Sequence, residues 1–534
     1  MRLKDSPTWL KVIVVSLLIL GIFFRFSHLG KKIYWHDEAF TSLAISGHTL
    51  AELQQEISNH DQAFSITILE QYQHLNPERG VADTVNYLIT SDPQHPPLYY
   101  VMARLWVQIF GDSPTEIRSL SALISLLIFP CVYWLCIELF NSPIVAWVAL
   151  GLIAISPLEI FFAQEARQYG LWMVTILLSS ATLLRAMRKE TILSWGIYSL
   201  TLILGLYTHL FAILVAIAQG VYVLIKQSFL WNKTLQNYLL AGIFSFIMFI
   251  PWLIIFCNNI HTALRLTSWS SVTIITNPLT IIAILLTRTT RIFFDVNLGS
   301  DAAWIYNLAS ESLLSYSIVT IVICFLLIAY FIYFFVKNRL FLKRDLLIFL
   351  LGIIPCLFLF LSDLVLGGIR SIYFRYQLPF YLSLQIILVY ILCCHVFSEH
   401  RCNQRISQLI LCLFIIAGLV SDFALFNTNS WWLQINGRNT LKIAKIVKDY
   451  EHPLLLSDDH VSNLGAILNL SQILPSKVKI LPIHHNHLVK IPPEYKTIFF
   501  FDFNNTLITQ IDNDETYFKK LIVPTINFWQ LKKK

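Results

Sequence analysis

Apolar stretches long enough to cross a membrane recur along most of this chain and limit what it can fold into. Hydrophobic residues make up 56% of its 534 residues and charged residues 13%, about half of the charged share of a soluble protein. A helix needs about 20 apolar residues to cross a bilayer, and its backbone must satisfy its own hydrogen bonds there. The sequence therefore predicts an all-α polytopic membrane protein with about 11–13 transmembrane helices.

Eleven apolar runs are long enough to be predicted as spans. They cover residues 12–29, 119–139, 144–162, 168–184, 192–208, 210–226, 238–256, 314–336, 345–362, 378–396 and 407–422. Two shorter runs, 97–110 and 272–287, fit either tilted spans or helices that lie in the membrane interface. No A-x-A-like cleavage site follows the first run, so we expect it to be a retained helix and not a signal peptide.

Lysine and arginine residues are crowded into one set of short loops between these runs. The set includes Arg185, Arg188 and Lys189 after the fourth run and four cations at 337–344 after the eighth. The positive-inside rule places such loops in the cytoplasm. We therefore expect a multi-pass protein of the plasma (inner) membrane with a cytoplasmic N-terminus. The same bias accounts for the net charge of +7, so we expect no nucleic-acid partner.

Two domains are predicted from the distribution of polar segments. Residues 1–422 form a transmembrane domain with a large extracytoplasmic loop at 30–118, and residues 423–534 form a small α/β extracytoplasmic domain. In that tail, "PLLLSDDHVSNLGAILNLSQIL" and the following "KVKILPI" have the pattern of strand, helix and strand, and "KTIFFFDF" that of a buried strand. The nine cysteines lie almost entirely in apolar runs, which argues against a disulfide framework or a zinc site.

Five groups of polar residues fall at the predicted outer ends of the spans. Ionisable residues at membrane depth are costly and are usually retained for a function, so five groups on one side predict a shared site. Taken singly, each has a structural explanation, such as a solvated loop, a helix cap or an arginine that reaches the interface. The members selected for the site are Asp37, Glu38, His95, Glu165, Arg167, His209, Arg370, Arg375 and Tyr376.

These residue types suit one kind of chemistry. A carboxylate can remove a proton from an acceptor hydroxyl, and arginine with histidine can hold a phosphate group. The sequence shows no glycine-rich phosphate loop and no nucleotide-binding fingerprint. A phosphate bound at the outer membrane surface is then expected to belong to a lipid. The predicted reaction is one in which an acceptor displaces this lipid phosphate.

The same segments, in the same order, resemble a known family. "FRFSHLGKKIYWHDEAF", "HPPLYY", "QEARQYGL", "YTHLFA" and "RYQLPF" are similar to the dolichyl-phosphate-mannose-protein mannosyltransferase superfamily, whose bacterial branch includes aminoarabinose transferases. The resemblance covers residues from roughly 20 to 380 and implies a GT-C fold, described as glycosyltransferase family 39-like. It implies an inverting glycosyltransferase that takes a sugar from a polyprenyl-phosphate donor on the extracytoplasmic side.

The resemblance also implies roles for individual residues. Asp37 would be the catalytic base, with Glu38 beside it in contact with acceptor or donor, and Glu165 the second acidic position. His95 would line the donor pocket and Arg375 would bind the donor phosphate. The chain departs from some bacterial relatives, which carry Arg-Tyr shortly after the acidic pair and a lysine before the two prolines. Here Ala39 and Phe40 follow the pair, and His95 precedes the prolines, so sugar and acceptor stay open.

Other functions remain open at this point. A lipid or organic-anion transporter or flippase would be expected to show ionisable residues in mid-span and internal repeats, and a non-catalytic scaffold would use its tail to bind partners. A divalent metal ion is a candidate cofactor, because His36, Asp37, His95 and Glu165 offer oxygen and nitrogen ligands. The expected partners are a polyprenyl-linked sugar, membrane lipids, and a lipid, glycan or protein acceptor.

Overall fold

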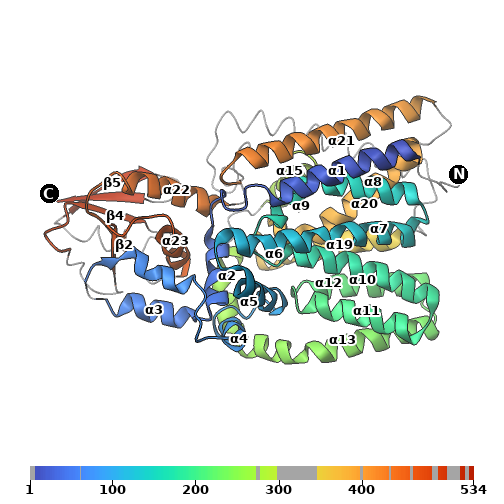
Figure 1. Ribbon diagram of the computed structural model, residues 1–534. Helices are drawn as coiled ribbons and strands as arrows, with labels where there is room; N and C mark the ends of the chain where they lie inside the picture. The colour runs from blue at the N-terminus through green and yellow to red at the C-terminus, as the bar shows by residue number, and fades with distance from the viewer. Residues whose placement is uncertain are drawn as a thin grey trace. The chain divides into compact units, whose positions relative to one another are not determined.

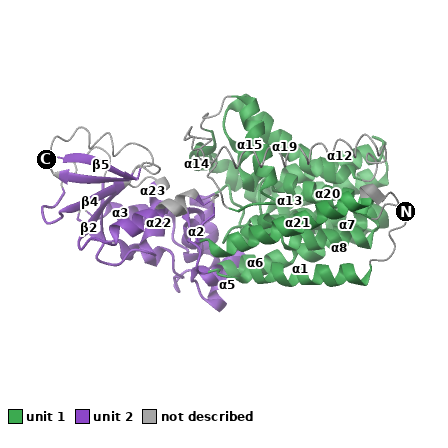
Figure 2. Ribbon diagram, turned by 90° about the horizontal axis from the view of Figure 1, so that it is seen from above, with its two compact units in different colours: residues 1–29, 93–99, 118–428 green, residues 30–92, 100–117, 429–534 purple. Residues whose placement is uncertain are grey.

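The protein, seen here in a computed structural model, divides into two compact units (Figure 1 and Figure 2). Unit 1 consists of residues 1–29, 93–99 and 118–428, and unit 2 of residues 30–92, 100–117 and 429–534. The structure describes residues 7–60, 62–271, 277–296, 345–396, 401–431, 434–457, 461–483, 491–501, 517–523 and 528–533.

Unit 1 is helical. Its helices are α1 (Thr8–Phe26), α7 (Ile128–Phe140), α8 (Pro143–Ala154), α9 (Pro157–Ala163), α10 (Tyr169–Lys189), α11 (Ile192–Leu206), α12 (Ala212–Lys226), α13 (Lys233–Asn258), α14 (Ile260–Leu266), α15 (Pro278–Thr290), α19 (Leu346–Leu366), α20 (Leu378–Val396) and α21 (Arg401–Asn427). Helix α6 (Pro114–Leu126) begins in unit 2 and continues into unit 1. Short 3-10 turns η2 (Ser268–Ser271), η3 (Arg370–Ile372) and η4 (Phe374–Gln377) lie in the connections.

Membrane-spanning helices are confirmed as the basis of the fold. Among the described residues, seven helical stretches are long and apolar enough to cross a bilayer, or eight if the bent pair α8–α9 is counted as one span. Helices α11 and α12 match two further predicted spans but have only 15 residues each. The predicted span at 314–336 lies outside the described residues. Of the two ambiguous runs, 97–110 corresponds to α5 (Leu98–Phe110) and 272–287 overlaps α15.

The tip of the α11–α12 hairpin does not reach the C-terminal end of the longer helix α13 beside it. The Tyr207 hydroxyl, just after α11, donates a hydrogen bond to the Met248 carbonyl of α13 at 2.8 Å. Helix α13 continues for ten more residues to Asn258, which is about 15 Å along its axis at 1.5 Å per residue.

Helices α1 and α8 approach each other closely where α8 ends. The bend between α8 and α9 is 58°, and Pro157 at the start of α9 has no N–H to offer the Ile153 carbonyl, its partner in a continuous helix. The fully buried Arg25 of α1 replaces that donor: its Nη2 donates to the Ile153 carbonyl at 3.2 Å and its Nη1 to the Ala154 carbonyl at 2.5 Å. Gly21, one turn earlier, leaves room for this contact.

Unit 2 is built on a six-stranded mixed sheet with the order β1-β3-β2-β4-β6-β5. Its strands are β1 (Phe64–Ser65), β2 (Pro453–Ser457), β3 (Lys479–Pro482), β4 (Thr497–Phe501), β5 (Tyr517–Val523) and β6 (Phe528–Lys533). Strand β2 is parallel to β3 and β4, and the other pairs are antiparallel. The strands predicted in the tail are thus present, with α23 (Val461–Ser471) between β2 and β3. The sequence did not indicate β1, β5 and β6.

The grouping of the chain differs from the predicted domains, because the loop at 30–118 packs with the tail. That loop contains α2 (His36–Ser46), α3 (Leu50–Ser58), η1 (Ile66–Tyr72), α4 (Val81–Ser91) and α5, most of which belongs to unit 2, and α22 (Ile435–Val447) opens the tail. Ser65 in β1 pairs with Lys479 in β3, and the Gln73 side chain donates to the Leu468 carbonyl at 2.7 Å. In α5 the buried Arg104 donates to the Ile45 and Asn76 carbonyls.

The close approach of α1 to α8 predicts a strong difference between two glycine substitutions. A Cβ on Gly21 would lie 2.2 Å from the Ala154 carbonyl oxygen, whereas one on Gly242 in α13 would have nothing within 4 Å. We expect Gly21→Ala to cost about 1–3 kcal/mol through overpacking, and Gly242→Ala to be neutral or to stabilise by up to about 1 kcal/mol. The apparent Tm of the purified protein in nanodiscs measures both. Equal Tm values for the two variants would contradict the packing described.

Candidate anion-binding site

Four side chains predicted from separate segments gather in unit 1: His95, Arg167, His209 and Arg375, called here the basic cluster. Nη2 of Arg167 lies 3.1 Å from Nε2 of His95. His95, Arg375 and Arg167 all act electrostatically on His209. The described structure therefore brings together groups that are up to 280 residues apart in the chain, from His95 to Arg375.

Local structure places Arg167 and its neighbour Glu165 in the connection between α9 and α10. Both side chains are buried, with 4% and 2% exposure, and the Arg167 N–H donates to the Glu165 carbonyl at 2.8 Å. The preceding Gln164 side chain donates to the Phe24 and Ser27 carbonyls at the end of α1, at 2.5 and 2.9 Å. The end of α1 thereby fixes the start of this connection.

His209 occupies the tight loop between α11 and α12. Its ring stacks on Trp172 of α10, with centroids 4.0 Å apart and planes 9° from parallel. The Phe211 N–H donates to Nδ1 of His209 at 3.2 Å, so in the neutral ring the proton resides on Nε2. Burial, followed by the nearby His95, Arg375 and Arg167, holds the pKa of His209 well below its usual value. The free site therefore contains a neutral imidazole with an Nε2–H donor.

Aromatic rings surround the guanidinium of Arg375. Its Cζ lies 5.6–5.9 Å from the ring centroids of Tyr169, Trp269, Tyr373 and Tyr376. Aromatic faces attract cations within about 6 Å, and they do so without neutralising the charge. These ring contacts therefore leave the positive charge of Arg375 in place. Trp269 was not predicted, since nothing in the sequence around residue 269 links it to residue 375.

Arg370, another predicted phosphate ligand, has different surroundings. Its Nη1 lies 3.2 Å from Oδ1 of Asp363, a carboxylate that the sequence analysis did not select. Its Nη2 donates to the Ser271 hydroxyl at 2.6 Å. Arg370 is therefore engaged with three partners of unit 1, because Nη1 also donates to the Gly367 carbonyl at 2.7 Å.

The acidic pair Asp37–Glu38 lies in unit 2, at the start of α2. Both residues are in the first turn of the helix, where a negative charge is favoured by the helix dipole. Glu38 is fully buried and its Oε2 accepts from the Trp35 N–H at 3.3 Å, which satisfies the N–H of the residue that precedes the helix. Asp37 is half-buried. The pair thus has a structural role through Glu38, and the reactive role of Asp37 stays a prediction.

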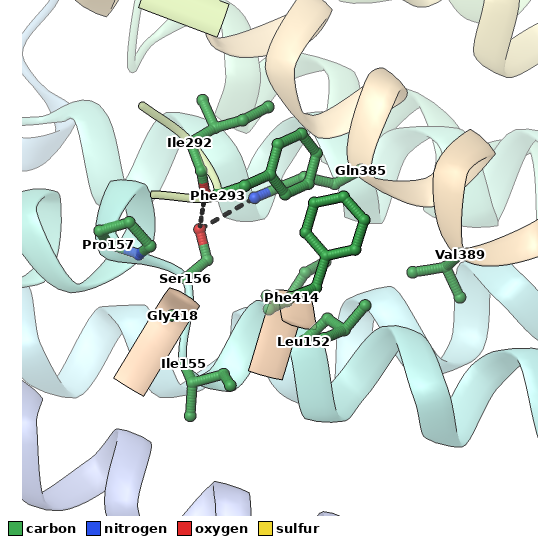
Figure 3. A pocket seen from close by; sticks show the side chains of 11 residues that line it. Leu152, Ile155, Ser156, Pro157, Ile292, Phe293, Gln385, Val389, Phe414 and Gly418 are labelled. Atoms are coloured by element: carbon green, nitrogen blue, oxygen red, sulfur yellow. Dashed lines mark hydrogen bonds between the residues drawn. The ribbon is translucent and has the colours of Figure 1, made fainter. Parts of the chain in front are cut away.

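Two further features of the described residues bear on ligands. No group of three or more His, Cys, Asp or Glu side chains gathers there into a metal-binding cluster. A small, mainly apolar pocket lies beside the α8–α9 bend (Figure 3), and none of the predicted site residues lines it. Its polar wall is Ser156, which donates to the Ile292 carbonyl at 3.1 Å and accepts from Gln385 at 2.9 Å.

Comparison with known proteins confirms the family resemblance over part of the chain. Residues 94–255 match the family described as dolichyl-phosphate-mannose-protein mannosyltransferase, a range that contains His95, Glu165, Arg167 and His209. No curated protein matches the chain.

Similar solved structures include two membrane enzymes. One is ArnT from Cupriavidus metallidurans bound to undecaprenyl phosphate, with 12% identity, 98% of each chain covered and a TM-score of 0.49. Another is the oligosaccharyltransferase from Archaeoglobus fulgidus in the apo form, with 13% identity, 87% of this chain and 64% of that chain covered, and a TM-score of 0.47.

The lowered pKa of His209 predicts how the affinity of the site for an anion changes with pH. A bound phosphodiester places negative charge near the ring and raises the pKa of His209 above its lowered free-state value. Binding then takes up a proton, and affinity increases as pH falls through the bound-state pKa toward the free-state pKa. The measurement is the affinity for a polyprenyl methyl phosphate, whose diester does not titrate in this range. The pH dependence of affinity should disappear in His209→Gln. An unchanged pH dependence in that variant would mean that another group takes up the proton on binding.

Proposed function

Since residues 94–255 match a family of sugar transferases, we propose that this protein is a membrane glycosyltransferase that uses a polyprenyl-phosphate-linked sugar. The observation that carries the proposal is the basic cluster, in which three of the four members, His95, Arg167 and His209, fall within the matched range. Two arginines and a histidine Nε2–H suit a phosphate group, and the surrounding helices of unit 1 are of membrane-spanning character.

In this proposal the cluster binds the donor phosphate. Arg375 and Arg167 supply fixed positive charge, and His209 supplies a neutral donor that gains charge when the anion arrives. Their contribution grows as the bond between the anomeric carbon and the phosphate oxygen breaks, because negative charge then accumulates on the leaving polyprenyl phosphate. Tyr376 lies at the edge of the cluster, with its ring 6.4 Å from that of His209.

Asp37 is proposed as the base on the strength of the family resemblance. An acceptor hydroxyl attacks the anomeric carbon, the carbon–oxygen bond to the phosphate breaks, and the hydroxyl proton passes to Asp37. One displacement inverts the anomeric centre. Glu165 and Glu38 are proposed as supporting carboxylates, and the acceptor is a lipid, a glycan or a protein on the extracytoplasmic side of the plasma membrane.

The test is direct donor identification. Purified protein in nanodiscs is incubated with a panel of radiolabelled polyprenyl-phosphate sugars and with membrane acceptors, and transfer and donor binding are measured separately. Transfer of any one sugar supports the proposal. Donor binding with movement across the bilayer but no transfer would instead support a flippase.

Asp37→Asn is expected to reduce turnover by roughly 10²–10⁴-fold, the usual contribution of a positioned base, with donor affinity unchanged. The matched control is Asp83→Asn, because Asp83 is also a first-turn carboxylate of a unit 2 helix and its Oδ2 accepts the Gly80 N–H at 2.7 Å. Asparagine keeps an acceptor oxygen at either position. Near-normal transfer by Asp37→Asn would remove Asp37 from the mechanism.

Arg375→Gln is expected to weaken donor binding by roughly 10–100-fold, because a hydrogen bond to a charged group contributes about 1.5–3 kcal/mol. Arg265→Gln serves as the control, since Arg265 is an exposed arginine at the end of α14 and should bind donor as the wild type does. Isothermal titration with a polyprenyl phosphate measures both. Equal affinities for the two variants would exclude Arg375 from the phosphate site.

A further inference from the structure

Asp363, near the end of α19, is a fully buried carboxylate at the base of the loop that carries Arg375. Its side chain has no exposed surface. Oδ1 accepts the Arg370 N–H at 3.0 Å and Nη1 of Arg370 at 3.2 Å, and Oδ2 accepts the Ser371 N–H at 2.6 Å. A buried carboxylate is costly unless it is paired and hydrogen-bonded, and these three bonds meet that condition.

Arg370 extends this arrangement to a second part of the chain. Through Nη2 it reaches the Ser271 hydroxyl at 2.6 Å, and next to it the Ile369 N–H donates to the Ser270 carbonyl at 2.9 Å. The backbone here allows no side chain: Gly368 has φ +124°, and a Cβ on it would lie 2.6 Å from both Nη1 of Arg370 and the Ser270 oxygen. The η2 turn and the η3 turn are thus joined side by side.

This junction lies next to Trp269, one of the four rings around Arg375. Trp269 lies in η2, next to Ser270, and its ring centroid is 4.4 Å from that of Tyr373 and 5.7 Å from Cζ of Arg375. Besides the backbone bond from Ile369 to Ser270, the Arg370 side chain, held by Asp363, joins η2 to the loop that contains Tyr373 and Arg375.

We propose that Asp363 and Arg370 form a positioning pair that holds Trp269 against Arg375 and so prepares the donor-phosphate site, and that Arg370 does not bind the phosphate itself. The pair acts through Arg375 and is not catalytic. The effect on donor binding rests on the proposed glycosyltransferase function, whereas the effect on the junction does not.

The two roles for Arg370 give opposite results for one substitution. If Arg370 were a phosphate ligand, Asp363→Asn would remove a competing carboxylate and donor affinity would increase. If the pair is a positioning device, the same substitution loosens the junction, and donor affinity falls by roughly tenfold, about 1.4 kcal/mol. In a transfer assay the KM for the donor rises while kcat at saturating donor stays near the wild-type value.

Three variants test the proposal in nanodiscs with a polyprenyl phosphate as the probe. Asp363→Asn and Arg370→Lys should both weaken binding, because lysine keeps the charge but lacks the planar fork that reaches Asp363, Gly367 and Ser271 together. Glu138→Gln is the matched control: its carboxylate is also buried and paired, with Arg188 at 2.9 Å, near the other end of α10 from Trp172. It should bind donor as the wild type does.

Hydrogen exchange of the same variants tests the junction without donor or turnover. Peptides covering 268–271 and 369–377 should exchange faster in Asp363→Asn and Arg370→Lys than in the wild type and in Glu138→Gln. If wild-type protein binds no donor, the proposed function fails, and the exchange result alone decides on the junction. Unchanged exchange, or tighter donor binding by Asp363→Asn, would overturn the positioning role.

Discussion

A helix that stops inside a bilayer leaves backbone carbonyls with no water to bind, so other donors must satisfy them. In this protein such carbonyls occur at the break between α8 and α9. Pro157 has no N–H for the Ile153 carbonyl, which accepts the Ser156 N–H at 3.4 Å instead. Arg25 of α1 adds one bond to this carbonyl and one to the Ala154 carbonyl. The guanidinium is itself buried, with Glu159 and Asp422 within electrostatic range. Beyond the break, α9 leads directly to the segment with Glu165 and Arg167. The orientation of that segment therefore depends on a contact made one helix away.

The basic cluster brings positively charged groups close together, and two features of the protein limit the resulting repulsion between them. The imidazole of His209 remains neutral in the free site, which removes one positive charge from a group of four bases. The rings around Arg375 attract its cation through their faces. In the proposed function, an anion bound here relieves repulsion among these groups in addition to making new contacts.

The sequence predicted the features that depend on local composition. Long apolar runs indicated the helices, and the order of the polar groups indicated His95, Arg167, His209 and Arg375 as neighbours. It did not indicate contacts that depend on how the chain returns on itself. Asp363 reads as a lone acid near the end of an apolar run, and Trp269 as an interfacial tryptophan. Glu38 seemed a reactive partner of Asp37, because its bond to the Trp35 N–H is evident only once the start of α2 is known. The strand β1 has two residues, too few for any pattern to indicate it.

The short helices α11 and α12 have a consequence for hydration. Their tip carries His209 at the level of Met248, about 15 Å along α13 from its end. If α13 spans the bilayer up to Asn258, a dissolved inorganic anion has to give up part of its water shell to reach this level. A phosphate attached to a hydrocarbon chain is already held in the membrane, and the burial of its chain compensates for part of that loss. In the proposed function, the hydrocarbon chain of the donor therefore favours a lipid phosphate over an inorganic phosphate of the same charge.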